Sequence, residues 1–109
     1  MKSGFRARWC IRDPKIFHKM GSDMRALAWV GEKEICVVSS SGSMGNEYPD
    51  NGATAEVYTN PDPKKYIELE LLGPLSVVKS NAPIWQTQNY SLRRRTGKPP
   101  EAEVAWPFR

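Results

Sequence analysis

Apolar and polar side chains alternate most clearly between Tyr66 and Leu72. In an extended chain the two sets lie on opposite faces: Ile67, Leu69 and Leu71 on one, Tyr66, Glu68 and Glu70 on the other. A period of two residues is typical of a strand with one face toward a core, so this segment predicts a half-buried β-strand.

Other short runs of apolar and β-branched residues predict further strands, each bounded by turn residues. These runs cover residues 5–11, 26–30, 34–39, 53–59, 75–79 and 84–93. The segment 31–33 is short enough to join two of them by a tight turn, and two prolines in 60–63 enforce another turn. In 84–93, polar residues fall on both faces, so its buried side stays open.

One short helix is expected between Asp13 and Gly21. Asp13 can cap free backbone amides, and Pro14 is pre-organised for a first helical position. Gly21 is a natural stop, and apolar residues between these points fall at helical spacing.

These elements predict one mostly β domain over residues 1–109, with an irregular tail over 96–109. Nine prolines and eight glycines punctuate the chain and favour short strands over long helices. The expected architecture is an antiparallel β-sandwich, or half of a supersandwich, with at most one short helix.

Charge and cysteine content indicate a cytoplasmic protein without a membrane segment. The net charge of +4 is modest and favours solubility. No apolar run reaches the length of a membrane span, and the N-terminus lacks the apolar core of a signal peptide. Cys10 and Cys36 lie in apolar runs without a CxxC pair, which predicts buried, reduced thiols.

Few residues point to catalytic or metal chemistry. His18 is the single histidine and has no second histidine or carboxylate pair near it in the sequence. No zinc-ligand spacing and no phosphate-binding loop is present. We expect no cofactor and no metal.

Glu68 and Glu70 are the strongest candidates for a ligand site. Strand geometry places them on one face, about 7 Å apart, with Tyr66 beside them. Carboxylates accept hydrogen bonds from sugar hydroxyls, and an aromatic ring packs on sugar C–H groups. The alternative is an ordinary solvated strand face. Trp85, one of four tryptophans, is the fourth candidate ligand contact.

The run Arg93 to Arg95, with Lys98 nearby, suggests a second kind of partner. Clustered arginines can contact nucleic-acid phosphates. Glu101 and Glu103 follow closely and no base-stacking module is visible, so a solvated strand end is the competing interpretation.

The segments 56–60 and 66–75 resemble a known family. Their "VYT" strand and the following "LE" strand, with a proline soon after, are similar to the C-terminal part of uncharacterised bacterial proteins with the galactose-mutarotase-like β-supersandwich. Aldose epimerases are the characterised relatives of that family. The resemblance extends from Cys36 to Leu92, and in size the chain is also similar to mobile gene cassette (integron) proteins.

The resemblance implies that Glu70 occupies the position of the epimerases' catalytic base. The glutamine that follows two positions later in the epimerases is Leu72 here, and their catalytic histidines have no counterpart. The fold is therefore expected to transfer better than the activity.

Three functions remain as hypotheses. The first is a carbohydrate-like or other small-ligand binding module that assembles as a homodimer, because a half-sandwich leaves open edges and exposed apolar surface. The second is an epimerase-like isomerase with Glu70 as base and Tyr66, His18 or another subunit as the source of the acid. The third is a basic nucleic-acid-binding protein, which we regard as the weakest.

Overall fold

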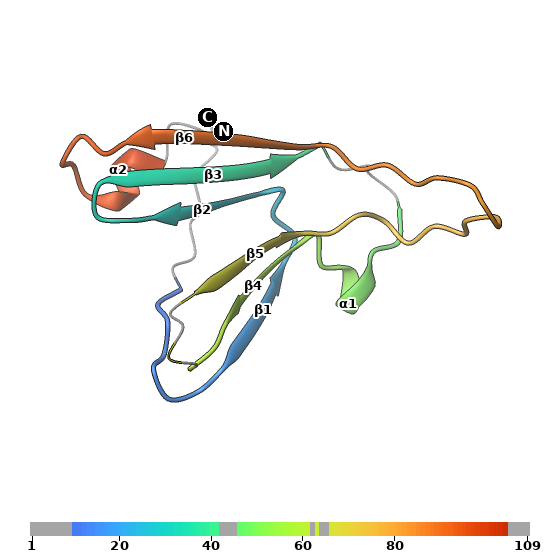
Figure 1. Ribbon diagram of the computed structural model, residues 1–109, viewed down its shortest axis with the longest axis horizontal. Coiled ribbons are helices and arrows are strands. Elements are labelled where there is room, and N and C mark those ends of the chain that lie inside the picture. Colours follow the sequence, from blue (N-terminus) through green and yellow to red (C-terminus); the bar gives the residue numbers. More distant parts are fainter. Residues whose placement is uncertain (1–9, 42–45, 62, 64–65, 105–109) are drawn as a thin grey trace, which may run out of the picture.

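The structure is a computed structural model that describes residues 10–41, 46–61, 63 and 66–104. It contains two antiparallel three-stranded sheets (Figure 1). Sheet A has the order β1 (His18–Ser22), β4 (Ala55–Thr59), β5 (Ile67–Leu71). Sheet B has the order β2 (Ala26–Val30), β3 (Glu34–Ser40), β6 (Gln88–Arg94). Two short helices, α1 (Pro49–Gly52) and α2 (Pro100–Val104), complete the described elements.

The predicted mostly β, antiparallel architecture is confirmed, and several strands lie where the sequence placed them. β2 and β3 form a hairpin through 31–33, closed by the hydrogen bond from Gly31 N to Glu34 O at 2.9 Å. β5 buries Leu71 and half-buries Leu69, whereas Glu68 on its opposite face is exposed. One helix was the expected maximum, and the described residues form two short ones.

The helix predicted after Asp13 is wrong. Asp13 Oδ1 does accept hydrogen bonds from the backbone amides of Lys15 and Ile16, at 2.7 and 3.3 Å, as a capping residue would. The chain then bends once and enters β1, whose five residues pair with β4. Pairing with β4 satisfies the same backbone groups, so tertiary context overrides the local helix signal.

Other boundaries differ from the expected ones for similar reasons. Residues 75–79 form no strand, and the strand expected over 84–93 begins only at Gln88, where pairing with β3 begins. In the expected strand 5–11, residues 5–9 lie outside the described part, and Cys10 and Ile11 are not in a strand. Within the expected irregular tail 96–109, α2 forms because Glu103 and Val104 pack into the body.

The core is organised by β3, which is buried on both faces. Ile35 and Val37 point to one side, where Val104 of α2 covers them together with residues of β2. Val38 points to the other side and packs against Ala55 of β4 and Leu71 of β5. The two small clusters therefore meet at a single strand.

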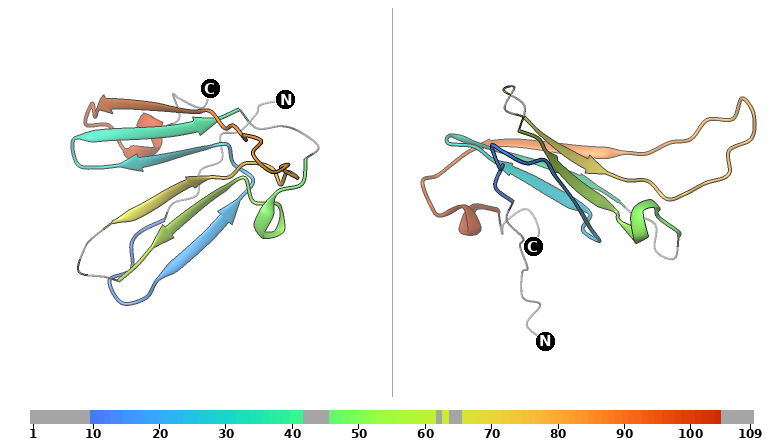
Figure 2. Two further views of the ribbon diagram at one scale, coloured as in Figure 1. Left: turned by 45° about the vertical axis from the view of Figure 1, so that its right-hand side comes forward. Right: turned by 90° about the horizontal axis from the view of Figure 1, so that it is seen from below.

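The two sheets diverge from the region where β5 contacts β2 and β3 (Figures 1 and 2). The radius of gyration of the Cα atoms is 15.7 Å, against about 13 Å for a compact domain of this length. The molecule is therefore open, and residues at the far ends of the sheets contribute little to the core.

An ion pair anchors α2 to sheet B. Arg95 Nε lies 2.7 Å from Glu103 Oε2, and Thr96 donates to Glu103 Oε1 through its backbone amide and through its hydroxyl at 2.8 Å. Arg95 Nη1 also donates to Gly31 O at 3.1 Å. These bonds join the end of β6, the β2–β3 turn and α2.

The cysteines are free, but they are not both buried as expected. Cys10 is exposed because it precedes the sheets, and Cys36 is half-buried on β3 beside Leu92. No helix in the described ranges is both long and apolar enough to cross a bilayer.

Replacing Ile35 should destabilise the fold strongly. Its side chain is fully buried, so Ile35→Ala leaves a cavity and is expected to lower the free energy of unfolding by about 2–4 kcal/mol. Chemical denaturation monitored by circular dichroism measures this loss. The control Ile16→Ala, at an exposed position, should change stability by less than about 0.5 kcal/mol. Equal losses would contradict the placement of the core.

Glu103→Gln should destabilise the protein at neutral pH and not at very low pH. The Arg95 hydrogen bond, followed by that of the Thr96 amide, lowers the pKa of Glu103 from 4.5 to about 2. Because the folded-state pKa is depressed, this contribution is complete above pH 4.5 and is lost as the pH falls toward 2.

Thermal unfolding at about pH 7 and about pH 2 tests this expectation. The Glu103→Gln variant should melt well below the parent protein at the higher pH and near it at the lower one. Glu101→Gln, a neighbouring exposed change on α2, should follow the parent at both. A Glu103→Gln deficit that does not depend on pH would contradict the ion-pair account.

Candidate functional site

Sheet A has one face lined by polar side chains, which we call the polar face. In the register of the sheet, Glu56 lies opposite Glu70 and Tyr58 lies opposite Glu68. Lys19 of β1 lies opposite Tyr58. Directly opposite residues point to the same side of an antiparallel sheet, so these five side chains share one surface. The other side of sheet A carries the apolar residues of β5.

Lys19 neutralises part of the negative charge on this face. Its Nζ lies 2.6 Å from Glu56 Oε2 and 3.8 Å from Glu70 Oε2. The hydrogen bond to Glu56 is the main cause that raises the pKa of Lys19, and the negative charge of Asp50 adds to it. The ammonium therefore stays charged, and the Glu56 carboxylate, which is almost fully buried, has a cationic partner.

The helical turn α1 lies at one end of the polar face. Asp50, Asn51 and Gly52 all have positive φ angles, of 50°, 61° and 87°. Asp, Asn and Gly are the residues that tolerate this region best, which explains the local sequence. A Cβ on Gly21 would lie 3.2 Å from Ala53 Cβ, so glycine allows the segment after α1 to approach β1 closely.

The structure brings three of the four predicted ligand residues to sheet A. Glu68 is exposed, and the side chain of Glu70 is 32% exposed. Tyr66, directly before β5, accepts a hydrogen bond from Asn60 Nδ2 through its hydroxyl. Trp85 does not join them, because it lies on the connection between β5 and β6.

Sequence reasoning missed Tyr58, Glu56 and Lys19 as members of this face. Tyr58 and Glu56 alternate with apolar Val57 along β4, and that alternation could have placed them on a common face. Their position beside Glu68 and Glu70 depends on the pairing of two strands, which no local pattern encodes. Lys19 lies in the segment whose local signals predict a helix, so the sequence pattern does not place it on the sheet.

His18 is positioned away from the polar face. It lies opposite Thr59, on the other side of sheet A from Glu68 and Glu70. Its Nε2 is 3.6 Å from Asp13 Oδ2. The pKa of Asp13 is lowered, mainly by the backbone hydrogen bond from Lys15 and also by His18. In the part of the chain that the structure describes, no three His, Cys, Asp or Glu residues form a metal-binding group.

The arginine run is divided between interior contacts and solvent. Arg93 donates to the backbone oxygen of Glu103, and Arg95 forms the ion pair with the same residue. Arg94 is the exposed member of the run. Two of the three guanidinium groups thus hold α2 in place.

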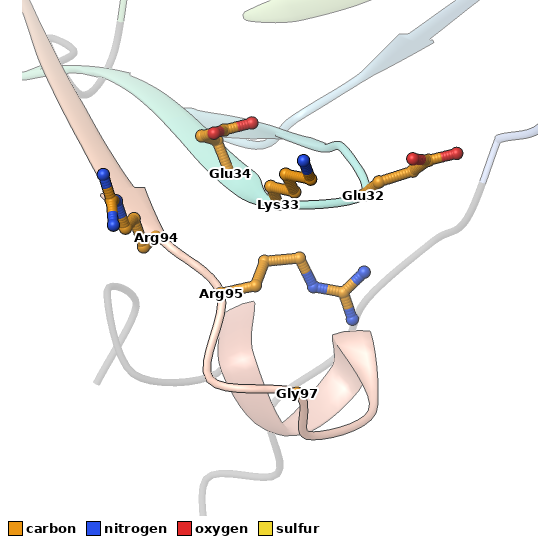
Figure 3. A pocket seen from close by; sticks show the side chains of 6 residues that line it. All are labelled: Glu32, Lys33, Glu34, Arg94, Arg95 and Gly97. Carbon is orange, nitrogen blue, oxygen red and sulfur yellow. The ribbon is translucent and has the colours of Figure 1, made fainter.

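A cavity of about 700 Å³ lies at the end of sheet B formed by the β2–β3 turn and the end of β6 (Figure 3). Both signs of charge line it. The lining residues come from the β2–β3 turn and the start of β3, and from the end of β6 and the segment after it: Glu32, Lys33, Glu34, Arg94, Arg95 and Gly97. Arg95 extends between the β2–β3 turn and α2 in Figure 3. Its Nη2 also donates a hydrogen bond to Lys98 O at 3.1 Å. The cavity is therefore crossed by a structural arginine and does not include any of the predicted ligand residues.

Comparison of the chain with protein-family models, with curated proteins and with solved structures finds no match. The function must be inferred from the polar face and the rest of the geometry alone.

Proposed function

We propose that the polar face of sheet A binds a polyhydroxylated small molecule of the carbohydrate class. The observation that carries this proposal is the cross-strand pair of Tyr58 and Glu68, with Glu70 on the same face. Directly opposite side chains in an antiparallel pair lie about 5 Å apart, so a ring packed on Tyr58 would be within reach of the carboxylate of Glu68.

The charges of the face restrict the ligand further. Among the described residues that the register places on this face, three carboxylates, Glu56, Glu68 and Glu70, stand against one ammonium, that of Lys19. An anionic ligand would be repelled by the remaining negative charge, whereas a neutral sugar or an amino sugar would not. Ionised carboxylates are strong acceptors for hydroxyl and ammonium donors. The ligand class is therefore a neutral or positively charged sugar.

The other two functions predicted from the sequence gain no specific observation. An isomerase with Glu70 as base needs an acid on the same side. His18 lies on the opposite side of the sheet, and the hydroxyl of Tyr66 accepts a hydrogen bond from Asn60 and, in the described part of the chain, not from a group that would activate it as an acid toward Glu70. For the nucleic-acid alternative, Arg93 and Arg95 are engaged by Glu103.

A direct test is titration of the protein with hexoses, hexosamines and hexuronic acids, monitored by amide chemical shifts. Shifts should map to β4 and β5 for a hexose or a hexosamine, and a hexuronic acid should bind more weakly. Binding by none of these sugars, or preferential binding of the acid, would contradict the proposal.

Glu68→Gln should weaken binding of the sugar found in that titration by about ten- to hundred-fold, because removal of a charge-assisted hydrogen bond costs about 1.5–3 kcal/mol. Its side chain is exposed, so the fold should be unaffected. Glu101→Gln removes the same charge from α2, which packs on the side of sheet B opposite to sheet A. This control variant should leave the affinity unchanged. Equal affinities of parent and Glu68→Gln would remove Glu68 from the site.

A further inference from the structure

Residues 72–87, which we call the arm, leave β5 and return to β6 without forming a helix or strand. The arm projects beyond both sheets (Figures 1 and 2). Connections of this length without secondary structure are uncommon in compact domains and are often functional. The length of the arm therefore makes it a candidate for a functional segment.

Hydrogen bonds at its base and tip give the arm a defined course. Leu72 N donates to Thr54 O at 2.9 Å, and Leu75 N donates to Glu47 O at 2.8 Å. On the returning side, Gln86 Nε2 donates to Leu71 O at 3.1 Å. At the tip, Ala82 N donates to Lys79 O at 3.0 Å across a turn. The base directs the arm away from the sheets.

The side chains of the arm are largely apolar and exposed. They are Leu75, Val77, Val78, Ile84 and Trp85. Val77 is fully exposed and Trp85 is 87% exposed. A tryptophan in water forgoes one of the largest gains from burial that any side chain offers. Several exposed apolar side chains on one projecting segment are typical of a surface that binds another molecule.

The same chain carries an apolar surface that its own described residues cover only in part. We call it the shared apolar face. It includes the cluster around Val38 and the residues of sheet B that the register places on the same side: Leu27, Trp29, Cys36, Tyr90 and Leu92. Sheet A covers Val38, but Tyr90 is 72% and Leu92 is 71% exposed.

The arm and the exposed margin of this face are continuous along the chain. Ile84 and Trp85 lie on the returning side of the arm, which runs directly into β6 with Tyr90 and Leu92 (Figure 1). Among the described strands β6 pairs with β3 alone, so no described strand lies along its other edge. One chain thus offers an apolar projection and, next to it, an apolar surface that the projection does not cover.

We propose that two copies of this chain exchange arms, each arm packing on the shared apolar face of the other copy. A two-fold axis near the junction of arm and β6 makes the contact isologous, so the assembly closes as a dimer. A second copy is the partner because both complementary surfaces are present on every chain. Exchange buries Trp85 and Leu92 in one contact and shields the edge of β6 that pairs with no described strand.

Sedimentation velocity of the full chain tests the dimer. The parent protein should sediment as a dimer at about 10 µM, and Trp85→Asp in the arm and Leu92→Asp on the face should each weaken association by about 30-fold or more. Both positions are exposed in the single chain, so circular dichroism should show the same β content. Ile16→Asp, an exposed apolar position outside both surfaces, is the matched control and should remain dimeric.

Mixing the two variants distinguishes arm exchange from other contacts. A mixed pair restores one arm–face contact, because the Leu92→Asp chain has an intact arm and the Trp85→Asp chain has an intact face. In a dimer of either variant alone, both arm–face contacts contain an aspartate, whereas the mixed pair keeps one contact without it. The mixture should therefore associate more strongly than either variant alone. A monomeric parent protein, a dimeric Trp85→Asp variant, or a mixture no stronger than its components would overturn the proposal.

Discussion

The structure depends on the burial of β3 from both sides. Ile35 and Val37 point toward α2, and Val38 points toward sheet A. Each of the two core clusters is too small to support a domain of its own, and β3 is the element that they share. Its neighbours β2 and β6 also satisfy its backbone groups along both edges. Loss of packing on either face would leave a strand with one side exposed.

The position of β3 explains why α2 and the arginine run have structural roles. Val104 can cover Ile35 only if α2 is held against sheet B. The ion pair between Arg95 and Glu103 supplies that attachment, and Arg95 reaches the β2–β3 turn as well. A basic run that resembles a phosphate-binding feature in the sequence thus closes one end of the fold.

On the other side of β3, the packing is incomplete. Sheet A contacts sheet B through β5 and then diverges, so Tyr90 and Leu92 are left at an exposed margin. The polar face, on the other side of sheet A, carries charged and hydroxyl-bearing side chains, so it cannot form a second core. The proposed exchange of arms places apolar side chains where sheet A does not reach. The ligand proposal uses the polar face and is independent of that exchange.

The sequence predicts the parts of this fold whose signals are local. The alternation at 66–72 and the turn at 31–33 both identify their strands, because period and turn chemistry are properties of a few adjacent residues. The prediction of a helix after Asp13 is wrong because the segment that follows the capping residue pairs with β4 as a strand. The position of Tyr58 beside Glu68 could not be predicted from the sequence either. It depends on the register between β4 and β5, and register is set between separate segments of the chain.

Native-state hydrogen exchange along the chain tests the central role of β3 most directly. Amides of core strands exchange at free energies near that of global unfolding, and amides of open regions exchange at far lower ones. We predict that the amides of Ile35 to Val38 exchange most slowly, and more slowly than those of β4, the central strand of sheet A. Slower exchange in β4 than in β3 would contradict the account, because it would place the principal core on sheet A.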